Sequence, residues 1–195
     1  MNHKGTVTIK TDRLILRKAT ENDIPAAFCN WMSDEKSAEF LRHPAHRDIS
    51  VTENALKKWI GRYKDLDYYR WVIILKEINE PIGTISAGGI DEKTKKINIG
   101  YCIGSRWWHC GYTSEALTAA LTFFFEQVKV KRIEGQHDPN NPNSGKVMKK
   151  CGMLYEGTLR QADWSNKGIV DTCIYGIVAA DYWDMAHKSC IGAGA

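Results

Sequence analysis

The stretch from residue 97 to residue 137 constrains the fold more than any other part of the chain. Residues 97–103 read as a strand, residues 111–128 carry apolar side chains at helical spacing, and residues 132–137 read as a second strand. A strand, a helix and a strand in this order form a βαβ unit. The sequence therefore predicts two parallel strands joined by a right-handed crossover.

Further strands are predicted on both sides of this unit. Alternating apolar residues over 6–18 indicate one strand, and residues 71–75 and 82–87 form two more that tight turns link to 97–103. This part of the chain therefore reads as an antiparallel meander that leads into the parallel pair. Two last strands are expected near 154–160 and 169–177.

Three more helices are expected. Asp23 is a plausible N-cap for residues 24–33, and Thr52 is a plausible N-cap for a helix that ends near residue 63. A short helix over 144–151 should end at Gly152, which suits the left-handed C′ position. The tail from about residue 185 is expected to be loose.

Composition narrows the class of protein. A chain of 195 residues fits a single domain spanning 1–195, with its core at about 7–183. The formal net charge of +4 is too small to indicate nucleic-acid binding. Neither a signal peptide nor an apolar run of ~20 residues is seen, so we expect a cytoplasmic protein without membrane contact. The six cysteines and six histidines lack metal-site spacing, so no metal is predicted.

Two stretches carry candidate chemistry, and each has a plain structural alternative. In residues 99–116 a strand, a glycine-containing loop and a helix follow one another, and backbone amides at such a helix start can hold an anion. The alternative is an ordinary tight turn. In residues 138–157, Asn141 and Ser144 stand at the start of a helix, where either could simply cap it.

Together the two stretches resemble the GNAT acetyltransferase superfamily, and most closely its Rim-type ribosomal-protein N-acetyltransferase branch. Residues 98–103 read N-I-G-Y-C-I against the family's E-I-G-Y-W-I, and residues 106–111 read R-W-W-H-C-G against [QR]-x-x-G-x-[GA]. Residues 111–116, G-Y-T-S-E-A, match G-Y-A-T-E-A. Residues 141–153 match N-x-x-S-x-[RK]-V-x-x-K-x-G-F except for a final Met, and residues 156–160 match E-G-x-x-R.

The resemblance implies an α/β (α+β) fold. It is a GNAT-like single domain whose central mixed, mostly antiparallel sheet has about seven strands, a splayed parallel pair and helices on both faces. It also implies an acetyl-coenzyme A (acetyl-CoA) site, with the pantetheine arm along the backbone edge at Cys102 and Ile103 and with its amides on Asn141. The pyrophosphate would lie on the loop that carries these residues: His109, Cys110, Gly111, Tyr112 and Thr113.

Two departures from the family pattern bear on this site. His109 replaces the first loop glycine, so its side chain either crowds the phosphate, unless the loop keeps a negative φ, or donates a hydrogen bond to it. Asn98 replaces the strand carboxylate of the Rim-type branch, so that position supplies no base.

The resemblance also implies the catalytic residues. Met148 stands where related enzymes have an acidic tyrosine, so Ser144, which would also contact the coenzyme, is the expected proton donor to the thiolate, with Tyr155 in reserve. The base is open between Asp138 and a water relay. An acetyl-cysteine intermediate through Cys110 or Cys151 is the less favoured route, since no base is evident beside either thiol.

The reaction expected is direct transfer of an acetyl group from acetyl-CoA to a primary amine in a ternary complex. The Rim-type resemblance favours the N-terminal amine of a protein as the acceptor. A small amine, such as a polyamine, amino sugar or antibiotic, is the first alternative. A coenzyme-A-binding sensor without turnover is the second. The sequence leaves the formation of a homodimer open.

Overall fold

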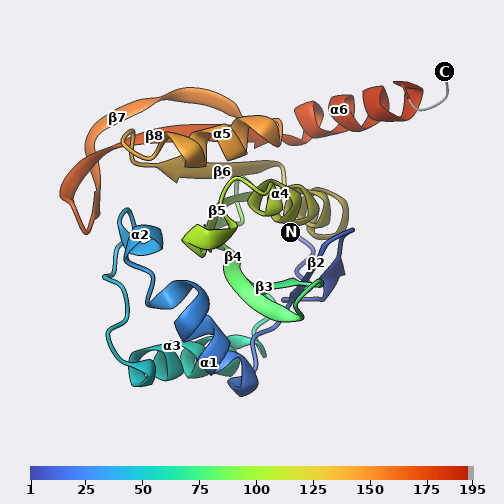
Figure 1. Cartoon of the computed structure of the whole chain (residues 1–195). Helices are drawn as coiled ribbons and strands as arrows, with labels where there is room; N and C mark the ends of the chain where they lie inside the picture. The colour runs from blue at the N-terminus through green and yellow to red at the C-terminus, as the bar shows by residue number, and fades with distance from the viewer. Residues whose placement is uncertain (193–195) are drawn as a thin grey trace.

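A computed structural model describes residues 1–192 of the chain, with side chains described through His187. Its strands form one sheet of eight in the order β1-β2-β3-β4-β5-β6-β8-β7 (Figure 1). The strands are β1 Ile9–Lys10, β2 Leu14–Arg17, β3 Tyr69–Leu75, β4 Glu80–Asp91, β5 Lys96–Ile103, β6 Arg132–His137, β7 Leu154–Ser165 and β8 Gly168–Val178. The expected first strand is two strands, β1 and β2, and the remaining six lie where the pattern predicted them.

The predicted parallel pair is β5 and β6, and the sheet opens between these two strands. The two strands pair in parallel from Lys96 with Arg132 to Asn98 with Glu134. Both continue beyond these pairs, β5 to Ile103 and β6 to His137, without further pairing to each other. The meander β3–β4–β5 is antiparallel, as predicted. The splay between β5 and β6 is therefore confirmed, and it leaves backbone edges free at their carboxyl ends.

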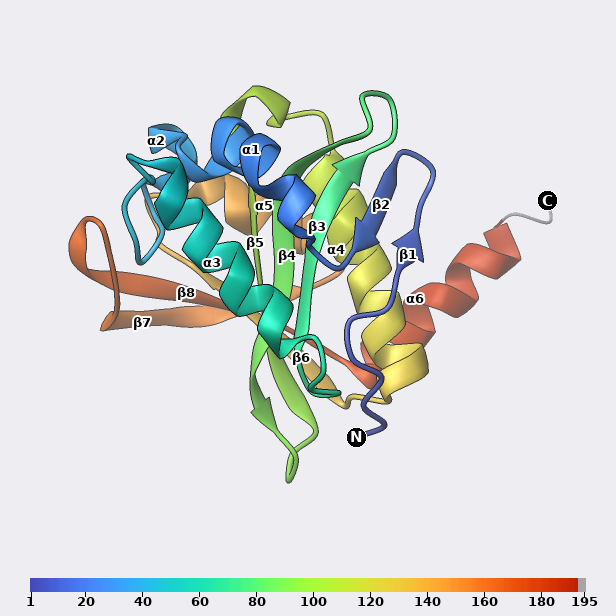
Figure 2. The ribbon, with the colours of Figure 1, turned by 90° about the horizontal axis from the view of Figure 1, so that it is seen from below.

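Helices cover both faces of the sheet, as Figures 1 and 2 show together. The helices are α1 Ile24–Ala27, α2 Glu35–Ala38, α3 Ile49–Arg62, α4 Tyr112–Phe123, α5 Pro142–Lys150 and α6 Ala179–Gly192. Short 3₁₀ turns occur at Glu21–Asp23 and Ser105–Trp107, and π-helical turns extend α1 over Phe28–Met32 and α4 over Phe124–Val128.

The alternation of β3 separates two hydrophobic cores. Trp71 and Ile73 face α4 in the larger core, whereas Val72 and Ile74 face α1 and α3 in the smaller one. All four side chains are at most 2% exposed, so β3 is buried on both faces. Burial of a side chain of this size contributes ~1.5–3 kcal/mol. The meander is thus the rigid platform on which β5 and its following loop are held.

The starts of the first two long helical segments match the prediction in part. Asp23 is the N-cap residue of α1, as predicted, but its side chain makes no capping hydrogen bond to α1. Its carboxylate instead accepts from Thr20 N, and it accepts two hydrogen bonds of 2.7 Å from the Arg17 guanidinium. Burial raises the pKa of Asp23, but the bonds from Arg17 and Thr20 outweigh it, and the net pKa is lowered. Helix α3 is capped by Asp48, whose carboxylate accepts from Ser50 N at 2.7 Å, because Thr52 is buried one turn later against His46.

The C-terminal prediction needs a correction. The backbone is helical from Ala179 to Gly192, so residues 185–192 continue α6 rather than forming a loose tail, and residues 193–195 lie outside the described residues. Tertiary packing explains the start of this helix, since the Tyr182 ring stacks on Phe125 with 4.8 Å between centroids and its hydroxyl donates to Glu126 at 2.7 Å. Within residues 1–192, none of the helices is both long and apolar enough to cross a membrane.

Candidate active site

A cavity of about 470 Å³ lies where β5 and β6 separate. Its volume is in the range of small-molecule sites, ~300–1,000 Å³. Its walls come from the β5 end, the following loop, the starts of α4 and α5, the β6 end and the segment after α2. Its lining includes Glu39, Phe40, Leu41, Tyr101, Cys102, Ile103, Trp107, Trp108, His109, Gly111, Thr113, Gln136, His137, Asp138, Asn141, Ser144, Lys146 and Lys150.

Most of the residues predicted to bind the coenzyme meet in this cavity. Those that line it are Cys102, Ile103, His109, Gly111, Thr113, Asn141 and Ser144. Cys110 and Tyr112 belong to the same loop, but their side chains do not line the cavity. The residues that line the cavity come from two segments about 40 residues apart in sequence. The two segments meet because the βαβ crossover places the starts of α4 and α5 at one edge of the sheet.

The start of α4 is suited to an anion. Gly111 occupies the N-cap position with φ +80°, a left-handed conformation that glycine adopts without strain, and no side chain caps the helix. The first-turn amides of a helix have no partner within the helix. Because α4 is 12 residues long, its dipole adds to their attraction for negative charge.

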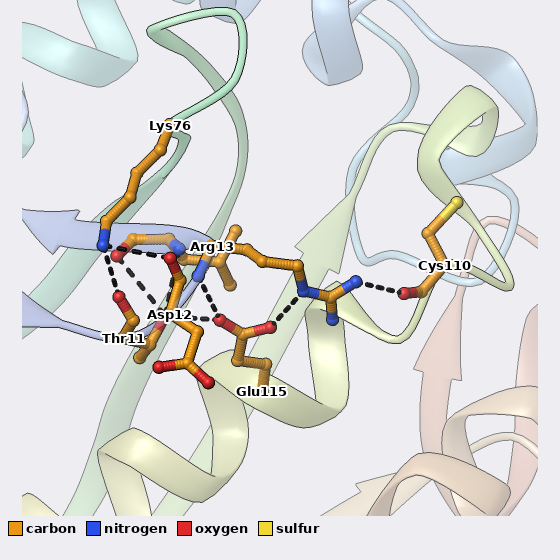
Figure 3. A network of polar contacts seen from close by, with 7 residues as sticks. Thr11, Asp12, Arg13, Lys76, Cys110 and Glu115 are labelled. Carbon is orange, nitrogen blue, oxygen red and sulfur yellow. Dashed lines mark hydrogen bonds and ion pairs between the residues drawn. The ribbon is translucent and has the colours of Figure 1, made fainter.

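Glu115 stands in the first turn of α4 but is turned away from these amides (Figure 3). Its carboxylate accepts from Thr11 Oγ1 at 2.6 Å, from Arg13 N at 2.9 Å and from Arg13 Nε at 2.7 Å. Burial raises the pKa of Glu115, but these bonds outweigh it and the net pKa is lowered. Glu115 therefore stays ionised and engaged, and it leaves the helix start free for a ligand.

Arg13 also holds the loop itself. Its Nη1 donates to the Cys110 carbonyl at 3.0 Å, and its guanidinium lies 4.5 Å from the centroid of the Tyr112 ring. Arg13 thus ties the turn between β1 and β2 to the loop before α4, through Cys110 (Figure 3) and through the Tyr112 ring. Cys110 and Tyr112 therefore contact Arg13, whereas their neighbours His109, Gly111 and Thr113 line the cavity.

His109 has φ +62°, so the negative φ that would keep its side chain from crowding a phosphate is not present. This left-handed conformation costs an L-residue ~1–2 kcal/mol, although histidine is among the residues that tolerate it. The family's glycine at this position is the residue that adopts it freely. The ring is exposed and lines the cavity, where it can donate to an anion.

We expect His109→Gly to raise the free energy of unfolding by about 0.5–1 kcal/mol, because relief of the left-handed strain exceeds the added freedom of the unfolded chain. Urea denaturation measures this. Lys129→Gly is the matched control, since Lys129 has φ +63° at the end of the π-turn after α4 and lies outside the cavity lining. If His109 donates to phosphate, His109→Gly alone also weakens coenzyme A binding. A free energy of unfolding of His109→Gly that is equal to or below that of the wild type would show that the left-handed conformation of His109 is not strained.

Asn141 and Ser144 are not occupied by the capping that was the structural alternative. Helix α5 begins at Pro142, so Ser144 lies inside its first turn rather than at the N-cap. Asn141 is the N-cap residue, but its side chain makes no capping hydrogen bond. Both side chains line the cavity. The predicted Gly152 at the end of this helix does have a positive φ, +84°.

Tyr101 is the residue of this site that the sequence analysis missed. Its hydroxyl donates to the Ser144 carbonyl at 2.9 Å and lies 3.2 Å from Ser144 Oγ. Burial raises the pKa of Tyr101 well above its usual range, so the phenol stays protonated. The alternation of β5 was a usable signal, because it places Tyr101 on the same face as Ile99 and Ile103, toward α4 and α5.

Three other predicted candidates lie apart from this pair. Tyr155 is 56% exposed on β7, outside the cavity lining, and its hydroxyl bonds to Thr158 at 2.8 Å. Cys110 is exposed and points away from the cavity. Burial raises the pKa of the Cys151 thiol, which opposes formation of the thiolate that a nucleophile needs. The geometry therefore favours Ser144 over Tyr155 and gives neither cysteine an activated thiol.

The backbone edge predicted for the pantetheine is partly used by the protein. The Ile103 carbonyl accepts from Trp108 Nε1 at 2.9 Å and from Ser37 Oγ at 3.0 Å. Trp107 and Trp108, which flank the loop in sequence, both line the cavity. Burial raises the pKa of Cys102 to about 12, so this lining thiol is neutral.

Contacts join the segment after α2, residues 39–42, to the β7–β8 hairpin. Part of this segment lines the cavity. Asn166 N donates to Leu41 O at 2.9 Å, Arg42 pairs with Asp163 at 2.6 Å, and Lys167 pairs with Glu39 at 2.8 Å. These contacts join segments about 120 residues apart in sequence. They hold Phe40 and Leu41 over the cavity wall opposite α5.

Comparisons with known proteins agree with this geometry. Residues 13–154 match the acetyltransferase (GNAT) domain family. The uncharacterised N-acetyltransferase YoaA of Bacillus subtilis (strain 168) is 30% identical over 87% of this chain and 96% of its own. The ribosomal-protein-serine acetyltransferase of Escherichia coli (strain K12) is 31% identical over 75% of this chain and 74% of its own.

A solved structure shows the same fold. The ribosomal L7/L12 alpha-N-protein acetyltransferase RimL, in complex with coenzyme A, superposes with a TM-score of 0.78 over 88% of this chain and 98% of its own, at 22% identity. The family match spans most of the chain and includes β5, the start of α4 and the whole of α5. The chain therefore belongs to the GNAT acetyltransferase family and is an N-acetyltransferase.

Proposed function

We propose that the enzyme transfers an acetyl group from acetyl-CoA directly to a primary amine, with both substrates bound in the cavity between β5 and β6. The observation that carries this is the course of the cavity. It runs from the free amides of α4, past Asn141 and Ser144, to the β6 end and the segment after α2. One long polyanionic substrate and a second, smaller group can therefore meet inside it.

The residues present fit coenzyme A. The start of α4 would receive the pyrophosphate, as argued above from Gly111. Lys146 and Lys150 stand on one face of α5 at the cavity wall, and neither forms an ion pair with any described residue. Their charges would attract the phosphates further. The free amide of Asn141 can donate and accept, as the amides of a pantetheine arm require.

Bound acetyl-CoA supplies an activated thioester, and the protein positions it and manages protons. Tyr101 holds the backbone of Ser144 by donating to its carbonyl, and the Tyr101 oxygen lies 3.2 Å from the Ser144 hydroxyl, which lines the cavity. That hydroxyl would donate to the sulfur as the thioester is cleaved. Asn98 lies on the face of β5 opposite Tyr101, and its amide accepts no proton.

We propose that the acceptor is the N-terminal amine of a protein. The relatives that support this are the Escherichia coli ribosomal-protein-serine acetyltransferase and the RimL structure, each named for ribosomal-protein acetylation. The apolar wall of Phe40 and Leu41 suits the side chain and backbone of a peptide's first residues.

Thiol release from acetyl-CoA tests the proposal across a panel of acceptors. The panel contains peptides that begin with Ser or Ala, the same peptides with acetylated N-termini, and spermidine, glucosamine and an aminoglycoside. Turnover only of peptides with a free N-terminus is expected. Turnover only of the small amines would replace the acceptor, and no turnover despite coenzyme binding would leave a sensor instead of an enzyme.

A further inference from the structure

One carboxylate of the cavity lining, that of Asp138, forms hydrogen bonds with the described residues through only one of its two oxygens. Asp138 follows β6 directly, lines the cavity, and is 8% exposed. Its Oδ1 accepts from Asn140 N at 2.8 Å and from Asn140 Nδ2 at 3.0 Å. Its Oδ2 is buried and has no hydrogen-bond partner among the residues that the structure describes. These two bonds hold the carboxylate in one orientation, in which Oδ1 accepts from Asn140 and Oδ2 does not.

The other carboxylates nearby already have partners. Glu39 pairs with Lys167, and Asp163 pairs with Arg42 and accepts from Gln136 Nε2 at 2.7 Å. Asp138 forms no ion pair with any residue that the structure describes. The remaining charged or titratable groups on the cavity wall include Lys36, His109, His137, Lys146 and Lys150.

His137, the neighbour of Asp138 in sequence, contacts the Asp138 backbone and not its carboxylate. Its Nδ1 lies 2.8 Å from the Asp138 carbonyl, which can only accept, so Nδ1 carries the hydrogen and donates. Its Nε2 is buried beside Gly145 and has no hydrogen-bond partner within the described part of the chain. The ring therefore provides Asp138 with no hydrogen bond to Oδ2, and the unpaired oxygen remains the strongest acceptor at this end of the cavity.

A buried carboxylate oxygen without a partner is unfavourable for folding. Such groups persist where a ligand completes them, and sites of this kind often exchange stability for function. The ligand that best completes an anionic oxygen is a cationic N–H donor. The proposed acceptor, an ammonium group at neutral pH, is a donor of this kind.

Resting on the proposed function, we propose that Asp138 binds the acceptor's ammonium group at Oδ2 and takes its proton. The freed nitrogen lone pair then forms the C–N bond with the thioester carbonyl carbon, and the C–S bond breaks as the adduct collapses. The sulfur takes the Ser144 hydroxyl proton, and Ser144 recovers one from the nitrogen. Asp138 releases its proton to solvent, so the products are the amide, coenzyme A and one proton.

The pH dependence of Asp138→Asn in the full chain tests this assignment. A peptide's N-terminal amine has a pKa of about 8. The wild type uses the charged amine, so its kcat/KM for a Ser-initiated peptide should be nearly flat from pH 6 to 7.5. Asp138→Asn must wait for the neutral amine, so its kcat/KM should rise about tenfold per pH unit and be lower by ~100-fold at pH 6.

Two further measurements separate this role from a structural one. Coenzyme A affinity should change less than twofold, and the melting temperature of Asp138→Asn should rise, because an unpaired buried charge is removed while its amide oxygen can still accept from Asn140. Asp171→Asn is the matched control, since Asp171 also accepts a backbone bond, from Gln161 N at 2.8 Å, but lies outside the cavity lining. It should match the wild-type pH profile.

The outcomes distinguish the two proposals. Unchanged coenzyme binding with a wild-type pH profile in Asp138→Asn would overturn the role of Asp138 and leave the proposed function standing. A lower melting temperature with activity lost equally at every pH would reduce Asp138 to a turn residue. A wild-type chain that binds acetyl-CoA but acetylates none of the panel would contradict the proposed function, and the assignment of Asp138 with it.

Discussion

Ser144→Ala is expected to lower kcat by roughly 30- to 100-fold while coenzyme affinity stays within about twofold. A general acid typically contributes ~10²–10⁴-fold, and a weakly acidic hydroxyl belongs at the low end of that range. The hydroxyl acts as the C–S bond breaks and not in the bound ground state, so kcat falls and binding does not. Steady-state thiol release and a coenzyme A titration measure the two effects separately.

The position of Ser144 in the structure separates its proposed catalytic role from a capping role. Ser144 lies within α5 and not at its N-cap, so its replacement removes no capping bond and the melting temperature should stay close to that of the wild type. Tyr101→Phe is the informative companion, because it removes the hydroxyl that holds the Ser144 carbonyl at 2.9 Å. Full kcat in Ser144→Ala with loss in Tyr101→Phe would make Tyr101 the acid. Loss only in Tyr155→Phe would return that role to Tyr155.

Gly104→Ala is expected to lower the free energy of unfolding by about 3 kcal/mol or more, beyond the usual ~1–3 kcal/mol of overpacking. Gly104 follows β5, and a Cβ there would stand 2.0 Å from the Asn30 carbonyl and 2.7 Å from the Trp107 ring. Its φ of −57° and ψ of 141° are open to alanine, so the cost is steric. The Asn30 carbonyl belongs to the π-turn after α1 and cannot move alone.

Gly100→Ala is the matched control on the same strand, because a Cβ at Gly100 meets nothing within 4 Å. Its effect on stability should stay within about 0.5 kcal/mol. Since Gly104 begins the segment that leads to the loop proposed to bind the pyrophosphate, Gly104→Ala should also weaken coenzyme A binding in whatever fraction folds. Equal urea midpoints for the two variants would show that the close approach of Asn30 does not exist in solution.

Features set by local periodicity could be predicted from the sequence. The alternation in β3, β4 and β5, the helical stripe of α4 and the strand β6 define the meander and the βαβ unit, and they place Asn141 and Ser144 at the carboxyl end of the sheet. The glycine at residue 152 marked a left-handed helix end, which its φ of +84° confirms. These signals lie within about ten residues of the feature that they predict.

Features that depend on contacts between distant segments could not be predicted from the sequence. Tyr101 meets Ser144 across 43 residues, and Asn166 meets the segment after α2 across more than 120. Nothing in the local pattern of either segment encodes the other. Helix α6 was missed for the same reason, since Tyr182 is held by Phe125 and Glu126. Asp48 rather than Thr52 caps α3 because Thr52 is fully buried, which only the tertiary structure decides.

The central claim is that the cavity between β5 and β6 binds acetyl-CoA, and calorimetric titration of the wild-type chain with acetyl-CoA tests it most directly. One site per chain is expected. At about 100 times its Kd, the ligand should stabilise the fold by ~2.7 kcal/mol, or roughly 5–10 °C in Tm for a chain of this size. Asn141→Ala should weaken binding by about 1–3 kcal/mol, through loss of the amide proposed to bond to the pantetheine. No heat and no Tm shift at millimolar acetyl-CoA, or equal affinity in Asn141→Ala, would contradict the account.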